Sequence, residues 1–368
     1  MLIKKILCVF FIVLVIFCRY ALAETPTILS PFDTKILERP IRAELVLKIG
    51  SDKTNEDFYK LCSFTIDKKG QIYILDAGNS RIQCFSKEGK FLFGFGRQGQ
   101  GPGELSNDTS KIKILSDGNI YVIDNLQRRI NVYNLDGKFL FSGKTSVYYN
   151  DIELLNNTYY LSSILLEENY KPIHISRKLG KIDGEFGILV EPAVGLLQQI
   201  NRLRFPQPWR ISFSRYNFTN IIVTNKNEII FSQDHPYRLI KYDAKGQVLK
   251  DIMGDVDFDT YAHVKLTVEK DGVSVSSTKP ARILDVSIKN DNLVVVPYLD
   301  LEKNFFYIDI FDLDLNLISR YKMPNIIVDA RKEEYIDQAL IDNDNNLYAT
   351  VISQENYPQL VKYKLIFD

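Results

Sequence analysis

A stretch of 24 residues that occurs twice, 48 residues apart, constrains the fold of this chain more than any other feature. Residues 70–93 read GQIYILDAGNSRIQCFSKEGKFLF and residues 118–141 read GNIYVIDNLQRRINVYNLDGKFLF, with eleven identical positions and no gap. Each copy contains three short runs of β-branched and aromatic residues separated by turn-forming residues, and a further apolar run precedes it. Such a unit of four short strands, here called A to D, predicts one blade of a β-propeller.

Weaker copies of the unit continue to the end of the chain. They cover residues 152–186, 227–250, 283–320 and 338–367. The last copy ends after its third strand, and residues 43–49 (AELVLKI), before the first blade, have strand-like composition. Pairing these two segments would remove an exposed sheet edge. We therefore expect an all-β fold: a six-bladed β-propeller of four-stranded antiparallel blades, closed by an N-terminal strand that completes the last blade. No turn-strand-turn pattern recurs in residues 254–280, so we expect no seventh blade.

The motif of the two clear copies resembles the repeat of NHL-repeat proteins, six-bladed β-propellers that bacteria export. The first copy contains Asp-x-x-Asn-x-Arg-Ile at 76–82, Phe-x-x-x-Gly-Lys-Phe at 85–91 and the run FGRQGQGPGE at 95–104. The resemblance is specific over residues 59–143, looser over 219–250 and architectural elsewhere. It implies the propeller fold and no particular reaction, because in this family the fold is better defined than the activity.

The N-terminus predicts export. Lysines at positions 4 and 5 precede an apolar run over residues 6–18, and Ala21-Leu22-Ala23 provides the small residues of a signal-peptidase site. The run is shorter than the ~20 residues of a membrane-spanning helix, and Phe17 does not suit lipid attachment at the following cysteine. We expect cleavage after Ala23, no membrane span in the mature protein, and an extracytoplasmic location, either periplasmic or secreted. The expected divisions are a signal peptide (1–23), a lead segment (24–40) and the propeller (41–368).

Charge and cysteine content narrow the possible functions and cross-links of the protein further. Lys plus Arg and Asp plus Glu both number 46, without long blocks of one sign, so we expect no nucleic-acid binding, and we expect a monomer. Cys62 and Cys84 fall in strands A and C of one blade, with a strand between them. Adjacent strands lie ~4.8 Å apart, which places these two beyond the roughly 4.4–6.8 Å that a disulfide spans. We expect no disulfide between them.

The repeated charged residues predict structural rather than catalytic roles. Asp76 and Arg81 bracket the B–C connection of the first copy, and Asp124 and Arg129 repeat them in the second. Because repeat units share their scaffold while a catalytic site is normally unique, we interpret these pairs as turn clasps made by charge-assisted hydrogen bonds. Glycines at hairpin turns should adopt positive φ; they are Gly70, Gly89, Gly118, Gly137 and Gly246.

Polar residues recur early in strand A of every unit and predict a ring at one mouth of the central channel. They are Ser63, Lys111, Asp151, Asn220, Asp285 and Gln338. Six-bladed metal-dependent lactonases and amidating lyases hold an ion near such a place. Here a lysine interrupts the ring and histidine is absent from it, so we predict no metal site and no cofactor; a channel-bound divalent ion is the alternative.

All the long connections expected from the repeats, residues 188–218, 254–280 and 321–336, join strand D to the next strand A and so belong on one face of the ring. The first contains arginines beside the only tryptophan, a composition typical of interaction surfaces; a cap over the channel is the alternative interpretation. Candidate binding residues are Arg204, Trp209, Arg210, Tyr261 and His263. The sequence favours an exported binding or scaffold module that presents this face to a protein, peptide or glycan. The alternative is a metal-dependent propeller enzyme of the lyase or lactonase type.

Overall fold

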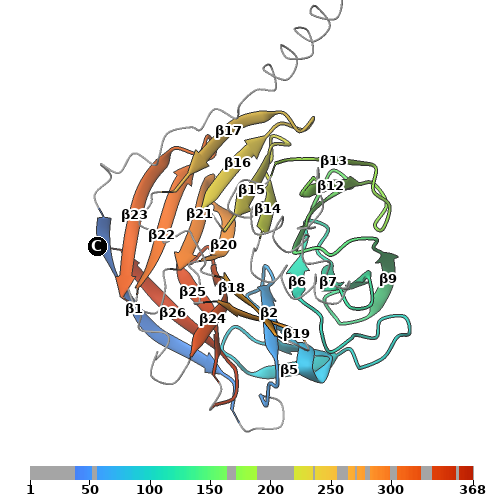
Figure 1. The fold of residues 1–368 in the computed structure, drawn as a ribbon. Helices are drawn as coiled ribbons and strands as arrows, with labels where there is room; N and C mark the ends of the chain where they lie inside the picture. Colours follow the sequence, from blue (N-terminus) through green and yellow to red (C-terminus); the bar gives the residue numbers. More distant parts are fainter. Residues whose placement is uncertain are drawn as a thin grey trace, which may run out of the picture.

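Four-stranded antiparallel sheets follow one another along the chain, as the repeat predicts. The computed structural model describes residues 38–51, 56–163, 171–188, 219–234, 237–254, 264–269, 272–277, 282–298, 305–324, 334–353 and 356–367. Figure 1 shows the sheets arranged around a common axis, with the first strand of each sheet innermost. The expected six-bladed β-propeller is confirmed.

The first four blades each consist of four consecutive strands paired with their sequence neighbours. The first blade comprises β2 (Leu61–Ile66), β3 (Ile72–Asp76), β4 (Arg81–Phe85) and β5 (Phe91–Phe95), with a 3₁₀ turn, η1 (Ala77–Asn79), between β3 and β4. The second comprises β6 (Lys111–Ile114), β7 (Ile120–Asp124), β8 (Arg129–Tyr133) and β9 (Phe139–Lys144). The third comprises β10 (Asp151–Leu155), β11 (Thr158–Ser162), β12 (Ile173–Ser176) and β13 (Gly184–Phe186). The fourth comprises β14 (Thr219–Val223), β15 (Ile229–Gln233), β16 (Arg238–Tyr242) and β17 (Val248–Met253).

The N-terminal strand closes the ring, as expected. The fifth blade comprises β20 (Arg282–Lys289), β21 (Asn292–Tyr298), β22 (Phe305–Asp312) and β23 (Leu317–Pro324), and the sixth β24 (Tyr335–Ile341), β25 (Asn346–Ile352) and β26 (Gln359–Phe367). Strand β1 (Glu38–Ile49) pairs antiparallel with β26 from Ile41 onward, and its first three residues pair parallel with β23. It thereby joins the last two blades into one eight-stranded sheet.

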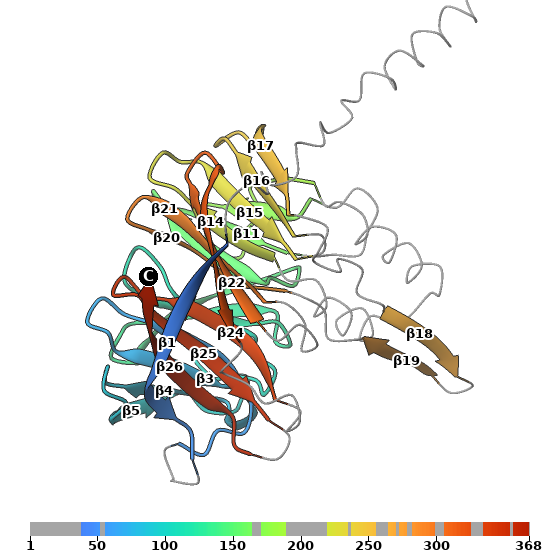
Figure 2. The ribbon, with the colours of Figure 1, turned by 90° about the vertical axis from the view of Figure 1, so that its left-hand side faces the viewer.

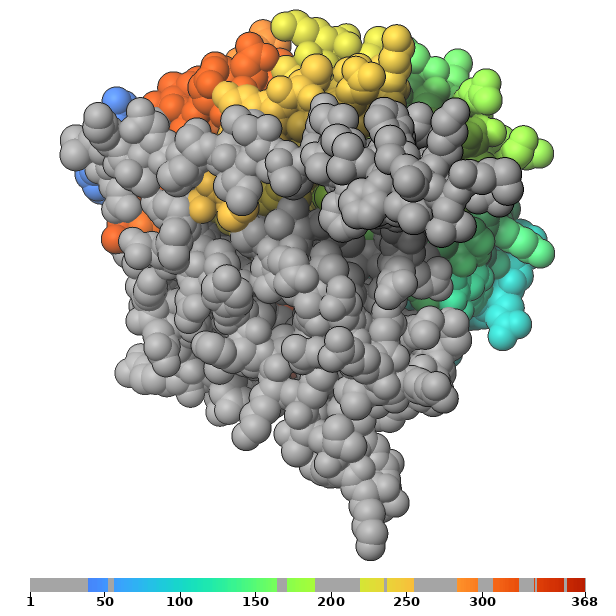
Figure 3. Space-filling model, turned by 45° about the horizontal axis from the view of Figure 1, so that its top comes forward, coloured from blue at the N-terminus to red at the C-terminus, as the bar shows by residue number. Residues whose placement is uncertain are grey.

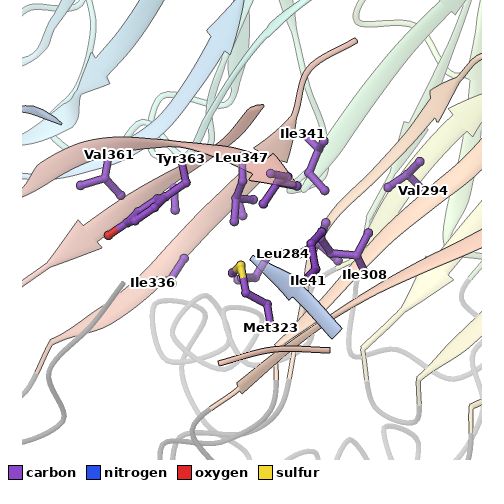
Figure 4. Packing of buried hydrophobic residues seen from close by; sticks show 14 of the residues in the cluster. Ile41, Leu284, Val294, Ile308, Met323, Ile336, Ile341, Leu347, Val361 and Tyr363 are labelled. Carbon is purple, nitrogen blue, oxygen red and sulfur yellow. The ribbon is translucent and has the colours of Figure 1, made fainter. Parts of the chain in front are cut away.

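Apolar packing fixes this closure. Ile41 of β1 is buried in the cluster between the fifth and sixth blades, where Figure 4 shows it beside Ile308, Leu284 and Met323. Burial of a side chain of this size stabilises a fold by roughly 1.5–3 kcal/mol. Leu45 of the same strand is 54% exposed, so the strand is anchored by one face.

One expected connection holds an unpredicted hairpin, and the bounds of another are wrong. Residues 254–280 join the fourth blade to the fifth and form no seventh blade, as expected. They contain a hairpin, β18 (Val264–Glu269) and β19 (Gly272–Ser277), which among the described residues pairs with no blade and stands off one side of the ring (Figure 2). The expected connection over residues 321–336 is also shorter, because β23 continues to Pro324 and β24 begins at Tyr335. The repeat pattern missed this extension because pairing with β22 and β1, not local sequence, prolongs β23.

The turn geometry and the placement of the cysteines agree with the predictions from the sequence. The five hairpin glycines all have φ between 77° and 83°, so the expected positive φ is confirmed. No disulfide joins Cys62 in β2 to Cys84 in β4, and β3 lies between these strands. No helix among the described residues is long and apolar enough to cross a membrane.

The blades follow chain order around the ring. Figure 3 shows the described residues of one rim as successive groups: the fifth blade in orange, the fourth in yellow, the third in green and the second in cyan. In a closed ring of six, the second and fifth blades therefore lie opposite each other across the central channel.

Candidate functional site: the central channel

The predicted polar ring divides into two kinds of residue. Ser63, Asp151 and Gln338 are buried, with 1%, 2% and 9% of their surface exposed. Lys111, Asn220 and Asp285 are partly exposed. All six lie in the innermost strands of their blades.

The buried members hydrogen-bond across blade boundaries. Gln338 Oε1, in the sixth blade, accepts from Ser63 Oγ and from the N–H of Phe64 in the first blade, each at 2.9 Å, and Gln338 Nε2 donates to the Phe64 carbonyl at 3.2 Å. Ser63 Oγ also accepts from the N–H of Ile112 in the second blade at 3.3 Å. An innermost strand has no partner strand on its channel side, and these side chains satisfy its backbone groups.

Asp151 combines this role with an ion pair. Its carboxylate accepts from the N–H of Ile221 in the fourth blade at 3.2 Å and from Lys113 Nζ in the second blade at 3.0 Å. Lys113 Nζ also lies 2.8 Å from Glu153 Oε1. Although burial by itself would lower it, the two carboxylates raise the pKa of Lys113, whereas burial raises the pKa of Glu153. Each charged group of this cluster therefore has a partner of opposite charge.

Lys113 and Glu153 were not predicted. Each lies two residues after a predicted ring member in a strand, and therefore on the same face of its sheet. Extending the ring by this period of two would have found them.

Asp285 differs from Asp151, the other acid of the predicted ring. Its only hydrogen-bond donor among the described residues is Ser287 Oγ, at 2.9 Å. Burial raises the pKa of Asp285 to about 6, opposed by the Ser287 hydroxyl and then by the positive charges of Lys111, Lys113 and Lys289. Because Lys111 and Lys113 belong to the second blade and Asp285 to the fifth, this interaction crosses the channel.

Lys289 adds a second perturbed group in the fifth blade. Its Nζ is buried without a hydrogen-bond partner among the described residues. Burial lowers the pKa of Lys289 to about 8, while the carboxylates of Asp342, Asp285 and Asp344 act to raise it. Asp285 and Lys289 are both perturbed titratable groups of β20, and such groups mark a candidate functional site.

Asn220 bonds within its own blade, Nδ2 to Ser232 Oγ at 3.2 Å. Among the described residues no group of three His, Cys, Asp or Glu side chains is arranged to hold a metal ion. His174 is buried in β12, where its Nδ1 lies 3.0 Å from Tyr149 Oη.

In the first blade, the predicted clasp ties strand B to the chain that enters strand A. Asp76 is fully buried, and its Oδ1 accepts from the N–H groups of Tyr59 and Lys60 at 3.1 Å each. Its Oδ2 accepts from Arg81 Nε at 3.1 Å, and Arg81 also pairs with Asp57 at 2.7 Å. The pair therefore anchors the start of the blade.

In the second blade, Asp124 accepts from the N–H and the hydroxyl of Ser106, at 2.9 and 2.7 Å. Arg129 donates instead to the carbonyl oxygens of Gln100 and Glu104 in the glycine-rich connection between the first two blades. Carboxylate and guanidinium thus hold the same connecting segment through separate hydrogen bonds.

The five candidate binding residues, Arg204, Trp209, Arg210, Tyr261 and His263, lie outside the described residues.

Comparison with known proteins gives the same class of fold. The DUF5128 family model, described as a 6-bladed beta-propeller, matches residues 55–194, the segment that contains the first three blades. No curated protein sequence matches the chain.

Solved structures match most of the chain. One is a protein from Bacteroides fragilis NCTC 9343 that is named as exported, with 14% identity, a TM-score of 0.55, and coverage of 89% of this chain and 95% of that one. A DUF4221 member from Bacteroides vulgatus has 10% identity, a TM-score of 0.55, and coverage of 90% and 100%. A catalytically inactive virginiamycin B lyase from Staphylococcus aureus with quinupristin has 14% identity, a TM-score of 0.50, and coverage of 88% and 100%. At these identities the similarity concerns the fold alone.

Proposed function

We propose that this protein is exported after cleavage following Ala23 and acts as a binding module of the NHL-repeat type. The D–A face would receive a protein, peptide or glycan partner, with Arg204, Trp209, Arg210, Tyr261 and His263 as candidate contacts. Intact-mass measurement of exported protein tests the first part, since the expected mature chain begins at Glu24.

The observation that carries the proposal is the coincidence of two features on one face. The hairpin β18–β19 lies in the D–A connection between the fourth and fifth blades. Strand A begins where that connection arrives, so the partly exposed charges of Lys111 and Asp285, both near the start of their strands, belong to the same end of the channel. Binding residues are commonly carried on loops held by a rigid scaffold.

The test compares the two faces of the ring. Binding of the purified protein to a glycan array and a random peptide library is measured for the wild type, for Trp209→Ala and for a variant with residues 264–277 replaced by a short Gly/Ser linker. Lys245→Ala, at an exposed C–D turn on the opposite face, is the matched control. We expect the first two changes to weaken binding at least tenfold, as for a buried aromatic anchor, and the control to leave it unchanged. Loss only in the control would contradict the proposal.

A further inference from the structure

We propose that a cavity at the junction of the sixth and first blades binds a short neutral saccharide or the end of a longer neutral glycan. The cavity has a volume of about 510 Å³, within the roughly 300–1,000 Å³ of small-molecule sites. Besides Gly50, its lining consists of polar and aromatic side chains: Lys48, Ser51, Glu56, Asn356, Tyr357 and Gln359. The inference rests on the proposed binding function, narrows its ligand class, and uses residues other than the candidate contacts named there.

The cavity lies on the face that carries the D–A connections. Strand β1 is the fourth strand of the sixth blade, so the chain that follows Ile49 is the D–A connection into the first blade. Asn356 and Tyr357 belong to the connection between β25 and β26, which is a B–C connection and lies on the same face of an antiparallel blade. The cavity is therefore on the face where we propose that partners bind.

Backbone contacts hold the walls of the cavity together. Gly50 has a φ of 126°, and a Cβ added there would lie 2.5 Å from the carbonyl oxygen of Pro358, so this close approach requires glycine. Ser51 donates from its N–H to the Glu56 carbonyl oxygen and from Oγ to Glu56 Oε2, each at 3.0 Å. Adjoining apolar residues are buried in the cluster between the sixth and first blades: Ile49, Phe58 and Leu360. The cavity is thus built on packed core.

Most of the polar groups that line the cavity are free to bind a ligand. Four lining side chains form no hydrogen bond or ion pair within the part of the chain that the structure describes: Lys48, Asn356, Tyr357 and Gln359. The ammonium group donates hydrogen bonds, the Glu56 carboxylate accepts them, and the amides and the phenol do both. A ligand that satisfies this mixture in a small space needs several groups that both donate and accept, as sugar hydroxyls do.

Tyr357 adds an apolar surface beside these groups. Its side chain is 48% exposed, and its ring contacts no other aromatic ring or cation among the described residues. One face of a sugar ring presents mainly C–H groups, which pack on an aromatic ring while the phenol hydroxyl keeps a polar partner. An exposed ring next to convergent polar groups therefore favours a saccharide.

Other classes of ligand fit this lining less well. An apolar ligand would remove water from the polar side chains without replacing their hydrogen bonds. An ion of either sign would meet a like charge, from Lys48 or from Glu56. An extended peptide pairs along the edge of one strand, whereas four of the lining residues lie in connections: Ser51, Glu56, Asn356 and Tyr357.

The experiment first asks which ligand class binds and then which residues hold it. Purified protein is applied to an array of neutral and acidic glycans and to a peptide array, and the affinity of the strongest neutral glycan is measured by calorimetric titration. We expect preferential binding of neutral glycans. Tyr357→Ala and Glu56→Gln should each weaken that glycan at least tenfold, through loss of the ring contact and of a charged hydrogen-bond acceptor.

The controls change the same residue types outside the cavity. Tyr59→Ala alters a tyrosine that is 77% exposed before β2, and Glu88→Gln alters an exposed glutamate in the C–D turn of the first blade. Neither change should alter the affinity, and circular dichroism checks that each variant is folded.

Three results would overturn the saccharide site: preferential binding of acidic glycans or peptides, no binding of neutral glycans, or an affinity that Tyr357→Ala leaves unchanged. Trp209→Ala separates this inference from the proposed function. A glycan weakened by that change but not by Tyr357→Ala supports the loop-face proposal and contradicts the cavity, and the opposite response supports the cavity and contradicts the role of Trp209.

Discussion

The first two blades and the last two build the same sheet from different local sequences. In the first two, strands are four to six residues long and glycine occupies the positive-φ position of the hairpin turns. In the last two, strands β20 to β26 are seven to nine residues long, and Leu315 and Asn345 occupy that position with φ of 57° and 59°.

The turn hydrogen bonds are nevertheless the same. Asp67 Oδ1 accepts from the N–H groups two and four residues later, at 2.8 Å each, and Asp312 and Asp342 do so at 2.8–2.9 Å. The constant element of the turn is thus the side-chain acceptor and not the glycine. Blades whose repeat sequence has diverged are stabilised by long-range contacts, namely the closing strand and buried charge pairs.

The closing strand gives the largest expected effect. Ile41→Asp places a carboxylate in the cluster between the fifth and sixth blades and should cost on the order of 5 kcal/mol, enough to unfold much of the protein. Leu45→Asp, at an exposed position of the same strand, should cost less than about 1 kcal/mol. Urea denaturation followed by circular dichroism measures both. Similar midpoints for the two variants would show that closure does not depend on this face of β1.

A buried ion pair of the fifth blade gives the next effect. Arg320 donates to both oxygens of Asp309, at 2.7 and 2.9 Å, and Tyr237 Oη of the fourth blade donates at 3.0 Å. Asp309→Asn should cost about 3 kcal/mol, because it leaves the arginine charge buried without its counter-ion. Asp314→Asn removes the carboxylate of a largely exposed residue from Lys241, which stays paired with Glu228, and should change the free energy of unfolding much less. Thermal denaturation measures both variants. If the two lost equal stability, the buried pair of Asp309 would contribute no more than the pair of Asp314.

Substitutions at equivalent ring positions of the first and fifth blades should change the free energy of unfolding in opposite directions. Ser63→Ala removes buried cross-blade hydrogen bonds and should cost about 1–2 kcal/mol. Asp285→Asn should instead stabilise the protein at pH 7.5 by about 1–2 kcal/mol, after allowance for partial exposure.

The pH dependence of the second change follows from linkage. The folded protein holds the Asp285 proton more tightly than the unfolded chain does, so wild-type stability falls as pH rises from about 4 to about 6. The advantage of Asp285→Asn should be full above pH 6 and vanish near pH 4. Urea midpoints across this range provide the measurement; a destabilised variant at pH 7.5 would mean that attraction to the lysines outweighs burial.

The smallest effect concerns the turns. At Gly118 an added Cβ would meet nothing within 4 Å, so Gly118→Ala isolates the strain of positive φ, about 1 kcal/mol. Asn345→Gly at the corresponding turn of the sixth blade should be neutral or slightly stabilising. Differential scanning calorimetry can resolve the two, and a neutral Gly118→Ala would show that the turn tolerates an L side chain.

Several features of the fold could be predicted. The glycine turns and the clear repeats follow from alternation and turn chemistry within a few residues, and the closing strand follows from the fourth strand that the last copy lacks. The hairpin β18–β19 was missed because its sequence does not repeat the blade. The end of β23 was missed because its last residues pair with β22, and those just before them pair also with β1 from the other end of the chain.

The sequence by itself determined which residues form strands and turns, and which polar residues recur at the start of each inner strand. Only the tertiary structure decided that Gln338 bonds to Ser63 and that Lys113 pairs with Asp151. The physical reason is how far apart in the chain the interacting residues lie. A turn hydrogen bond joins atoms that the chain already holds within four residues, whereas closing the ring places residues hundreds of positions apart side by side, and repeat spacing alone gives no register for those contacts.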